Sequence, residues 1–238
     1  MDERIIIRDI AEPDSPLLKE FPPESMVDFF AARVDMYENH MLMNTELGSF
    51  YQEIDQWIPI SKPAFRLLDL GCGTGLELEG LYKKYPAMQV RGIDLSPEML
   101  DKLREKFPDK ALDLVCSSFF DVEFGEDFDV VLSVYALHHF TEDEKRGLYQ
   151  RIREALAPEG FFLLGDFTAA TLKLQDSFRA ESNRIRSNNG IADDEFYHID
   201  TPLTTETEVR LMQEAGFEQV KVLYQEQYAS VIIAYVTH

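Results

Sequence analysis

A glycine-rich segment, LLDLGCGTGLELEGL at residues 67–81, is the part of the chain best suited to hold a ligand. An apolar run ends near Asp69, and Gly71, Gly73 and Gly75 then lead into an amphipathic helix. Glycines let a backbone turn tightly and approach a ligand closely. The third glycine comes one position too early for the dinucleotide pattern GxGxxG, and no lysine supplies the phosphate-binding pattern GxxxxGK[ST]. The spacing therefore departs from both common nucleotide-binding loops.

A second chemical feature is Asp94, which ends the next apolar run in the segment VRGIDLSPEML. It follows the last glycine by about 20 residues, where an acidic side chain can accept hydrogen bonds from the ribose hydroxyls of an adenosine ligand. A carboxylate at this place would also repel a 2′-phosphate, which argues against NADP. The alternative is that Asp94 only caps the helix that begins after Ser96. Because the glycine turn precedes it, we favour the ribose role.

The elements that must position these residues alternate between apolar runs and amphipathic helices, which is typical of βαβ units and a parallel sheet. Strands are expected at residues 65–70, 89–93, 112–116, 128–134, 161–164, 220–224 and 229–237. The last two runs are too close in the chain for a parallel crossover, so we expect an antiparallel hairpin. Ser96 before Pro97, and the capping box of Thr141 and Glu144, predict two helix starts, with Gly160 closing the second helix.

These segments together resemble a known family. LLDLGCGTG, GIDLSPEML and FDVVLSVYALHHF, followed later by an Ala215-Gly216-Phe217 turn, closely resemble the class I S-adenosylmethionine-dependent methyltransferases, over about residues 63–238. The resemblance implies an α/β, Rossmann-like, seven-stranded, mostly parallel sheet with an antiparallel last strand. It also implies S-adenosylmethionine as the cofactor and in-line methyl transfer to a small-molecule acceptor.

The family pattern carries over to individual positions. The residues that the resemblance implies for cofactor binding are Asp69, Gly71, Cys72, Gly73, Gly75, Asp94, Leu95, Met99, Ser117, Ser118, Phe119, Val134 and Tyr135. The glycine turn would surround the methionyl part and Asp94 the ribose, while Val134 and Tyr135 would approach the sulfonium. The family often has an acid after strand three for the adenine amino group, and here Ser117 and Ser118 take that place.

Catalytic side chains are harder to predict, because methyl transfer mainly needs the nucleophile, methyl carbon and sulfur held in line. A base helps only where the acceptor is protonated at the working pH. The candidate bases are Tyr37, His40, His138, His139, Asp166 and His198. Of these, we take Tyr37, His139 and His198 as the candidate catalytic residues. His138 and His139 could equally pack within a short helical turn. We expect no metal site, since His198 and Asp200 stand apart from other ligand types.

Acceptor selection is expected outside the core of the methyltransferase domain, which we place at residues 61–238. The stretch at residues 167–203 is long for a plain connection and predicts a helix and loop over the pocket, although an amphipathic helix packed on its own domain is the alternative. The N-terminal extension, residues 1–60, predicts helices. Their apolar stripe at residues 22–45 should form a lid whose Tyr37 faces the methyl group. Otherwise the stripe packs on an outer helix or on a second subunit, as in a homodimer.

Composition limits the partners. The chain has 238 residues and a formal net charge of −21, which would repel phosphate backbones and disfavours nucleic acid. Its 2 cysteines form no CxxC pair. The N-terminal residues lack the apolar core of a signal peptide, and no apolar stretch approaches membrane-spanning length. We therefore expect a cytoplasmic protein without a membrane partner.

Three other functions stay open. The segment TTETEVRLMQEAGFEQVKVLYQEQYASVIIAYV is similar to the tails of enzymes that make carboxy-S-adenosylmethionine for tRNA wobble-uridine modification. A non-catalytic protein that binds an adenosyl ligand would carry the same glycine turn and Asp94. An NAD-dependent oxidoreductase is the third, although the early third glycine counts against it.

Overall fold

A computed structural model describes residues 22–43, 51, 54–192 and 194–236 of the chain. Its seven strands form one sheet with the order β3-β2-β1-β4-β5-β7-β6. The strands are β1 (Arg66–Leu70), β2 (Gln89–Asp94), β3 (Leu112–Cys116), β4 (Phe128–Val134), β5 (Leu156–Phe167), β6 (Gln219–Gln225) and β7 (Ala229–Tyr235). The first five pair in parallel, and β7 pairs antiparallel with both β5 and β6. The expected fold class and hairpin are confirmed.

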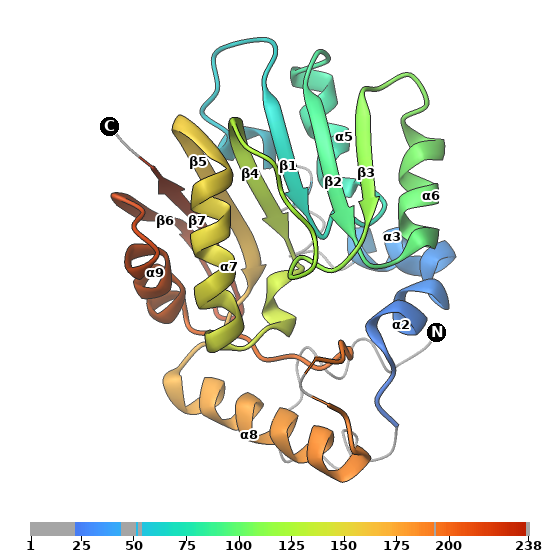
Figure 1. Cartoon of the computed structure of the whole chain (residues 1–238), viewed down its shortest axis with the longest axis vertical. Coiled ribbons are helices and arrows are strands. Elements are labelled where there is room, and N and C mark those ends of the chain that lie inside the picture. The colour runs from blue at the N-terminus through green and yellow to red at the C-terminus, as the bar shows by residue number, and fades with distance from the viewer. Residues whose placement is uncertain (1–21, 44–50, 52–53, 193, 237–238) are drawn as a thin grey trace.

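Helices cover both faces of this sheet (Figure 1). One face carries α5 (Leu76–Lys84) and α6 (Pro97–Lys106), and the other carries α7 (Glu142–Ala155) and α9 (Thr205–Glu214). Neighbouring residues of β1 show why: Leu67 packs in the core of the first face and Leu68 in that of the second. Because successive side chains point to opposite faces of a strand, a strand buried on both faces is a continuous apolar run.

The start signals of two helices are confirmed, and one predicted strand boundary is wrong. The Ser96 hydroxyl accepts a hydrogen bond from Met99 N, and Thr141 and Glu144 form the expected capping box. However, α7 ends at Ala155 and β5 begins at once, well before residue 161. Leu156 pairs with Phe128, and an irregularity in the ladder follows. Leu156 and Phe161 both pair with β4, so the segment between them, which holds Pro158 and Gly160, forms an irregularity within the strand.

The N-terminal stripe forms two helices rather than one, α2 (Met26–Ala31) and α3 (Val34–Met43). The break lies at Arg33, whose buried guanidinium donates to Phe29 O at 2.9 Å and to Glu24 Oε2 at 2.8 Å. The rest of the expected extension includes the 3-10 helix η2 (Ile54–Trp57). Residues 1–21, 44–50 and 52–53, which belong to the predicted extension and in part to the predicted lid, lie outside the described residues.

The long connection after β5 contains α8 (Leu172–Asn189) followed by a loop. Figure 1 shows α8 and α2 at the end of the molecule toward which the parallel strands point. The loop is joined to the segment before α2 through a bridge between Ser25 and Tyr197, and Met26 N and His198 N donate to Phe196 O and Glu24 O at 2.9 and 3.0 Å. Within the part of the chain that is described, no helix has the length and apolarity required to cross a membrane.

Candidate active site

A cavity lies at the carboxyl ends of β1 and β4. These two strands are neighbours in the sheet, and the strands that follow each of them continue toward opposite edges. Open parallel sheets bind ligands at this switch point. The cavity is lined by Met26, Phe30, Tyr37, Gly71, Gly73, Asp94, Leu95, Met99, Ser118, Phe119, Tyr135, Ala136, His139 and Phe140. The glycine turn, the end of β2, the turn after β4 and the N-terminal helices thus share one space.

The residues that the sequence assigned to cofactor binding divide into two groups. Those that line the cavity are Gly71, Gly73, Asp94, Leu95, Met99, Ser118, Phe119 and Tyr135. Those that do not line it are Asp69, Cys72, Gly75, Ser117 and Val134. Asp69, Cys72 and Val134 are buried in the interior, and Gly75 approaches the side chains of Leu103 and Phe107. Of the three candidate catalytic residues, Tyr37 and His139 line the cavity and His198 does not.

The glycine turn has two positions where a side chain would be costly. A Cβ on Gly71 would lie 2.3 Å from Ala136 Cβ, so the turns after β1 and β4 approach too closely for any other residue. Gly71 also has a φ of +78°, and Gly73 has a φ of +46°. A Cβ on Gly73 would meet no atom nearer than 4.0 Å. The backbone at Gly73 is therefore open to the cavity that it lines.

Asp94 holds the glycine turn and the start of α6 through hydrogen bonds, and it also lines the cavity. Its Oδ1 accepts a hydrogen bond from Ser96 N and its Oδ2 accepts one from Gly73 N, each at 2.9 Å. Burial raises the pKa of Asp94, and these backbone donors oppose that shift. Each carboxylate oxygen has two lone pairs and uses one of them here. Asp94 thus fixes the glycine turn and can still accept hydrogen bonds from a ligand in the cavity.

Tyr135, directly after β4, has a left-handed backbone with a φ of 49°. Such a conformation costs a bulky residue about 1–3 kcal/mol and concentrates at functional sites. Its backbone N–H donates to Gly165 O at 2.9 Å, which holds the turn against β5. The strain directs the chain so that both Tyr135 and Ala136 line the cavity.

Two carboxyl groups are buried behind the glycine turn, Asp69 at the end of β1 and Glu77 in the first turn of α5. Neither oxygen of Asp69 nor Oε1 of Glu77 has a hydrogen-bond partner among the described residues. Burial and the neighbouring Glu77 raise the pKa of Asp69, and burial raises the pKa of Glu77 to about 7. The sequence analysis did not identify Glu77. The available signal was an acid on the inward face of a helix that begins at the glycine turn.

Tyr37 of α3 lines the cavity and is hydrogen bonded to Tyr51. Burial and the charge of Glu77 raise the pKa of Tyr37, and burial also raises that of Tyr51. A tyrosine whose pKa is raised keeps its proton at neutral pH. Tyr37 is thus suited to donate a hydrogen bond to a ligand rather than to act as a base.

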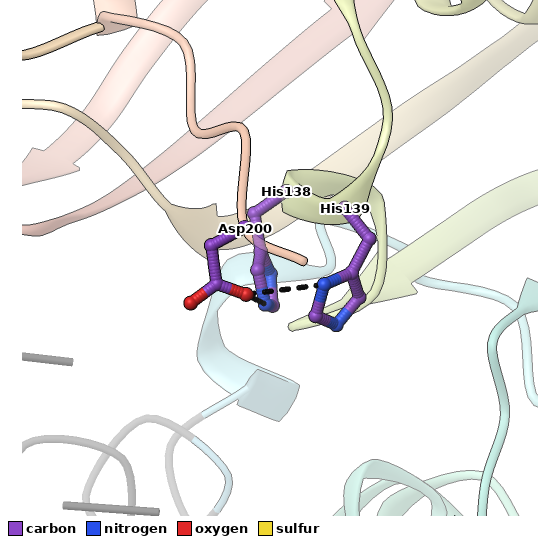
Figure 2. A group of neighbouring side chains, drawn as sticks. All are labelled: His138, His139 and Asp200. Atoms are coloured by element: carbon purple, nitrogen blue, oxygen red, sulfur yellow. Dashed lines mark ion pairs between the residues drawn. The ribbon is translucent and has the colours of Figure 1, made fainter. Parts of the chain in front are cut away.

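A group of histidines and acids lies beside this cavity (Figure 2). The short 3-10 helix η3 (Leu137–His139) supplies His138 and His139, and the loop after α8 supplies Asp200. His138 Nδ1 lies 2.7 Å from Asp166 Oδ1, and His139 Nδ1 lies 3.2 Å from Asp200 Oδ1. His198 stacks on Phe29, with ring centroids 3.5 Å apart. His198 therefore packs on α2 instead of entering the cavity.

The two adjacent histidines have opposite electrostatic surroundings. Burial opposes a charge on His138, but the charge and hydrogen bond of Asp166 outweigh it and raise the pKa of His138. Burial and the charge of His138 lower the pKa of His139. Although burial opposes its charge, Asp200 has a pKa well below the usual range, because of its contacts with His139 and the charge of His138.

Some of the site was missed in the sequence. Ala136 and Phe140 line the cavity without having been assigned a role in the site, whereas Met26 and Phe30 come from the predicted lid. The pairing of His138 with Asp166 was also missed, although a signal existed: Val134 and Gly165 pair in neighbouring parallel strands, so the residues after them meet at one sheet edge.

Comparisons with known proteins agree with this geometry. The family model described as a methyltransferase domain matches residues 67–160. A carboxy-S-adenosyl-L-methionine synthase from Trichodesmium erythraeum is 28% identical over 176 residues, covering 68% of this chain and 69% of the relative. A malonyl-[acyl-carrier protein] O-methyltransferase from Halorhodospira halophila is 29% identical over 145 residues, or 60% of this chain. The matched region spans only 48% of that relative's length.

Solved structures show the same fold. A structure from Nostoc punctiforme, described as a candidate O-methyltransferase, has a TM-score of 0.68 at 20% identity and covers 98% of this chain and 70% of that chain. The complex of DhpI with S-adenosylhomocysteine (SAH) has a TM-score of 0.66 at 15% identity, covering 87% and 93%. At 20% and 15% identity, these similarities show that the fold is shared.

Proposed function

Because this chain is a class I S-adenosylmethionine-dependent methyltransferase, we propose that it methylates a small molecule seated against Tyr37, His139 and Phe140. One observation carries the proposal: these three residues line the same cavity as Gly73 and Asp94. A ligand on the glycine turn and a ligand beside the aromatic residues would therefore be neighbours.

The residues present fit S-adenosylmethionine, which supplies a methyl group on a positively charged sulfur. The open side of Gly73 leaves room for the methionyl part, and the free lone pairs of Asp94 suit the ribose hydroxyls. Leu95, Met99 and Phe119 offer apolar surface for the adenine. Asp69 and Glu77 lie buried behind the turn, and a cation in the cavity would favour the ionised form of these acids.

At the acceptor side, we expect the chain to act by positioning. The neutral Tyr37 hydroxyl can donate a hydrogen bond to the acceptor, and Phe30 and Phe140 exclude water. Holding the reactants in line can supply much of the barrier reduction, about 7–11 kcal/mol in well-oriented systems. The net charge of −21 supports a small molecule rather than nucleic acid as the acceptor. We also retain a cytoplasmic location and a homodimer as expectations.

A second candidate function comes from the Trichodesmium relative, named as a carboxy-S-adenosyl-L-methionine synthase. An enzyme that builds a carboxylated S-adenosylmethionine must hold an additional negative charge beside the sulfonium. Among the described residues that line this cavity, none is a lysine or an arginine. The cavity therefore favours methyl transfer to a separate acceptor over this alternative.

Calorimetry and mass spectrometry of reaction products test the proposal. We expect the purified full chain to bind SAH but not NAD. With S-adenosylmethionine and a pool of phenols, amines and carboxylic acids, we expect SAH and a methylated product. A carboxylated S-adenosylmethionine would instead support the second candidate. Binding without turnover across acceptor classes would favour a non-catalytic protein, and tight NAD binding without SAH binding would overturn the proposal.

A further inference from the structure

We propose that His138, His139 and Asp200 bind a divalent first-row transition metal ion, such as Zn²⁺, at the edge of the acceptor side of the cavity (Figure 2). The candidate ligand atoms of the three side chains all lie within 4.8 Å of one another. Two imidazoles and one carboxylate are the protein ligands of several catalytic metal sites, which keep further positions for water or substrate. This proposal departs from the expectation of no metal site in the sequence analysis.

The distances suit such an ion. Bonds of about 2.0–2.2 Å from a metal to nitrogen and oxygen place neighbouring ligand atoms roughly 3–3.5 Å apart. His139 Nδ1 is 3.2 Å from Asp200 Oδ1, and His138 Nε2 is 3.8 Å from the same oxygen. The first pair is already at the required spacing. The second pair is wider by a few tenths of an ångström, and all three ligand atoms lie within 4.8 Å of one another.

Two of the atoms lack a well-oriented hydrogen bond within the described part of the chain. His139 Nδ1 and Asp200 Oδ1 are buried and lie 3.2 Å apart as an ion pair, but their contact does not have hydrogen-bond geometry. The two side chains are only 3% and 8% exposed. Buried polar atoms are nearly always satisfied in native proteins, so such a pair requires an explanation. An ion bound between these atoms would satisfy both.

A carboxylate behind the group orients one of the ligands. His138 Nδ1 is hydrogen bonded to Asp166 Oδ1 at 2.7 Å, which leaves Nε2 on the side that faces Asp200. Asp166 Oδ1 also accepts from Phe167 N at 2.9 Å, so the carboxylate is itself held. Metal-binding histidines usually donate their other ring N–H to such a carboxylate, which fixes the tautomer.

The backbone holds the two ligand-bearing segments together. Thr201 N donates to His138 O at 2.7 Å, and the Thr201 hydroxyl donates to the same oxygen at 3.3 Å. The loop with Asp200 is therefore attached directly to the turn with both histidines. Since His139 also lines the cavity, an ion here could take an acceptor oxygen in an open position. The acceptor class expected from this site has a metal-binding oxygen, such as a phenol or a hydroxy acid.

Metal titration of the full chain tests the inference without using activity. After removal of metal with a chelator, Co²⁺ is titrated and its visible absorption recorded, and Zn²⁺ is then added in competition. We expect one equivalent of Co²⁺ to bind and Zn²⁺ to displace it. Loss of a supporting carboxylate typically costs about 10–100-fold in metal affinity, so Asp166→Asn should weaken binding by that factor. His139→Ala and Asp200→Asn should weaken it by at least about 100-fold.

His40→Ala on α3 is the matched control and should leave Co²⁺ affinity unchanged, because His40 lies outside the group. SAH affinity and thermal unfolding of each variant show whether it is folded. A folded wild type that binds SAH but no Co²⁺ would overturn the metal site and leave the proposed function intact. Binding that both His139→Ala and Asp200→Asn leave within threefold of wild type would also overturn it.

Discussion

The protein buries charged side chains in two places that differ in how they are neutralised. Between α7 and α9, Glu208 accepts hydrogen bonds from Lys145 and from the Tyr149 hydroxyl, and we call these three residues the paired cluster. Behind the glycine turn, the two neighbouring acids Asp69 and Glu77 have no cation between them in the described part of the chain, and we call them the acid cluster. Lys145 and Glu208 are fully buried, and Asp69 is 1% and Glu77 4% exposed.

The paired cluster is suited to stabilise the fold, whereas the acid cluster is suited to serve a ligand. A buried carboxylate that meets a cation and a hydroxyl has both oxygens satisfied, so removing one partner is costly. Two neighbouring buried acids instead oppose each other's ionisation and lower the stability of the fold. Such a cluster is retained where its charge serves a ligand, and this one lies against the turn that lines the cavity.

Breaking the paired cluster should have the largest effect. In Glu208→Ala, the Lys145 ammonium would be left buried without its partner, and we expect a loss of about 3–5 kcal/mol in the free energy of unfolding. Denaturant unfolding measures it. Glu206→Ala, an exposed position on the same helix, should change little. SAH affinity of the folded fraction should stay unchanged, and a loss below about 1 kcal/mol would show that the cluster is not the stabilising one.

Asp94→Ala should produce the next largest effect, on ligand affinity. Losing charged hydrogen bonds to two hydroxyls should weaken SAH binding by about 2–4 kcal/mol, as measured by calorimetry. The melting temperature should also fall, because the N–H groups of Gly73 and Ser96 lose their acceptor. Asp101→Ala, which removes an exposed carboxylate of α6, is the control. An affinity within twofold of wild type would contradict the ribose role.

The smallest effect should be a change in pH dependence from Glu77→Gln. The pKa of Glu77 is raised by burial to about 7, so its contribution to stability is fully present below about pH 4.5 and is lost as the pH rises through 7. Between about pH 4.5 and 7, the free energy of unfolding of the variant should therefore fall less steeply than that of the wild type. Glu79→Gln, on the same helix, should retain the wild-type slope. Identical slopes for Glu77→Gln and wild type would show that Glu77 titrates normally.

The sequence predicted most of the fold because its signals were local. Strand runs such as residues 128–134, and the capping box at Thr141, depend on neighbours within a few positions. The boundary of β5 depended on pairing of Leu156 with a distant strand. The break at Arg33 depended on a partly buried ion pair with Glu24. Neither has a signature in the spacing of apolar residues.

The sequence predicted that the glycine turn and Asp94 lie at one sheet edge, and both line the cavity. The acceptor side was less accessible, because Asp200 meets His138 and His139 only after the loop beyond α8 folds back on η3. The pattern of residues 138 and 139 fits both a packed turn and a ligand group. That Asp200 lies beside both histidines could be learned only from the three-dimensional structure.

The contact between Ser25 and Tyr197 has a consequence for the order of events during turnover. It joins the segment before α2 to the loop after α8, although the two are far apart in the sequence. Met26 and Phe30 line the cavity from the first segment, while Asp200 extends from the second. A small molecule that enters or leaves between them must part both segments together. The rate of product release would then depend on how quickly this junction opens.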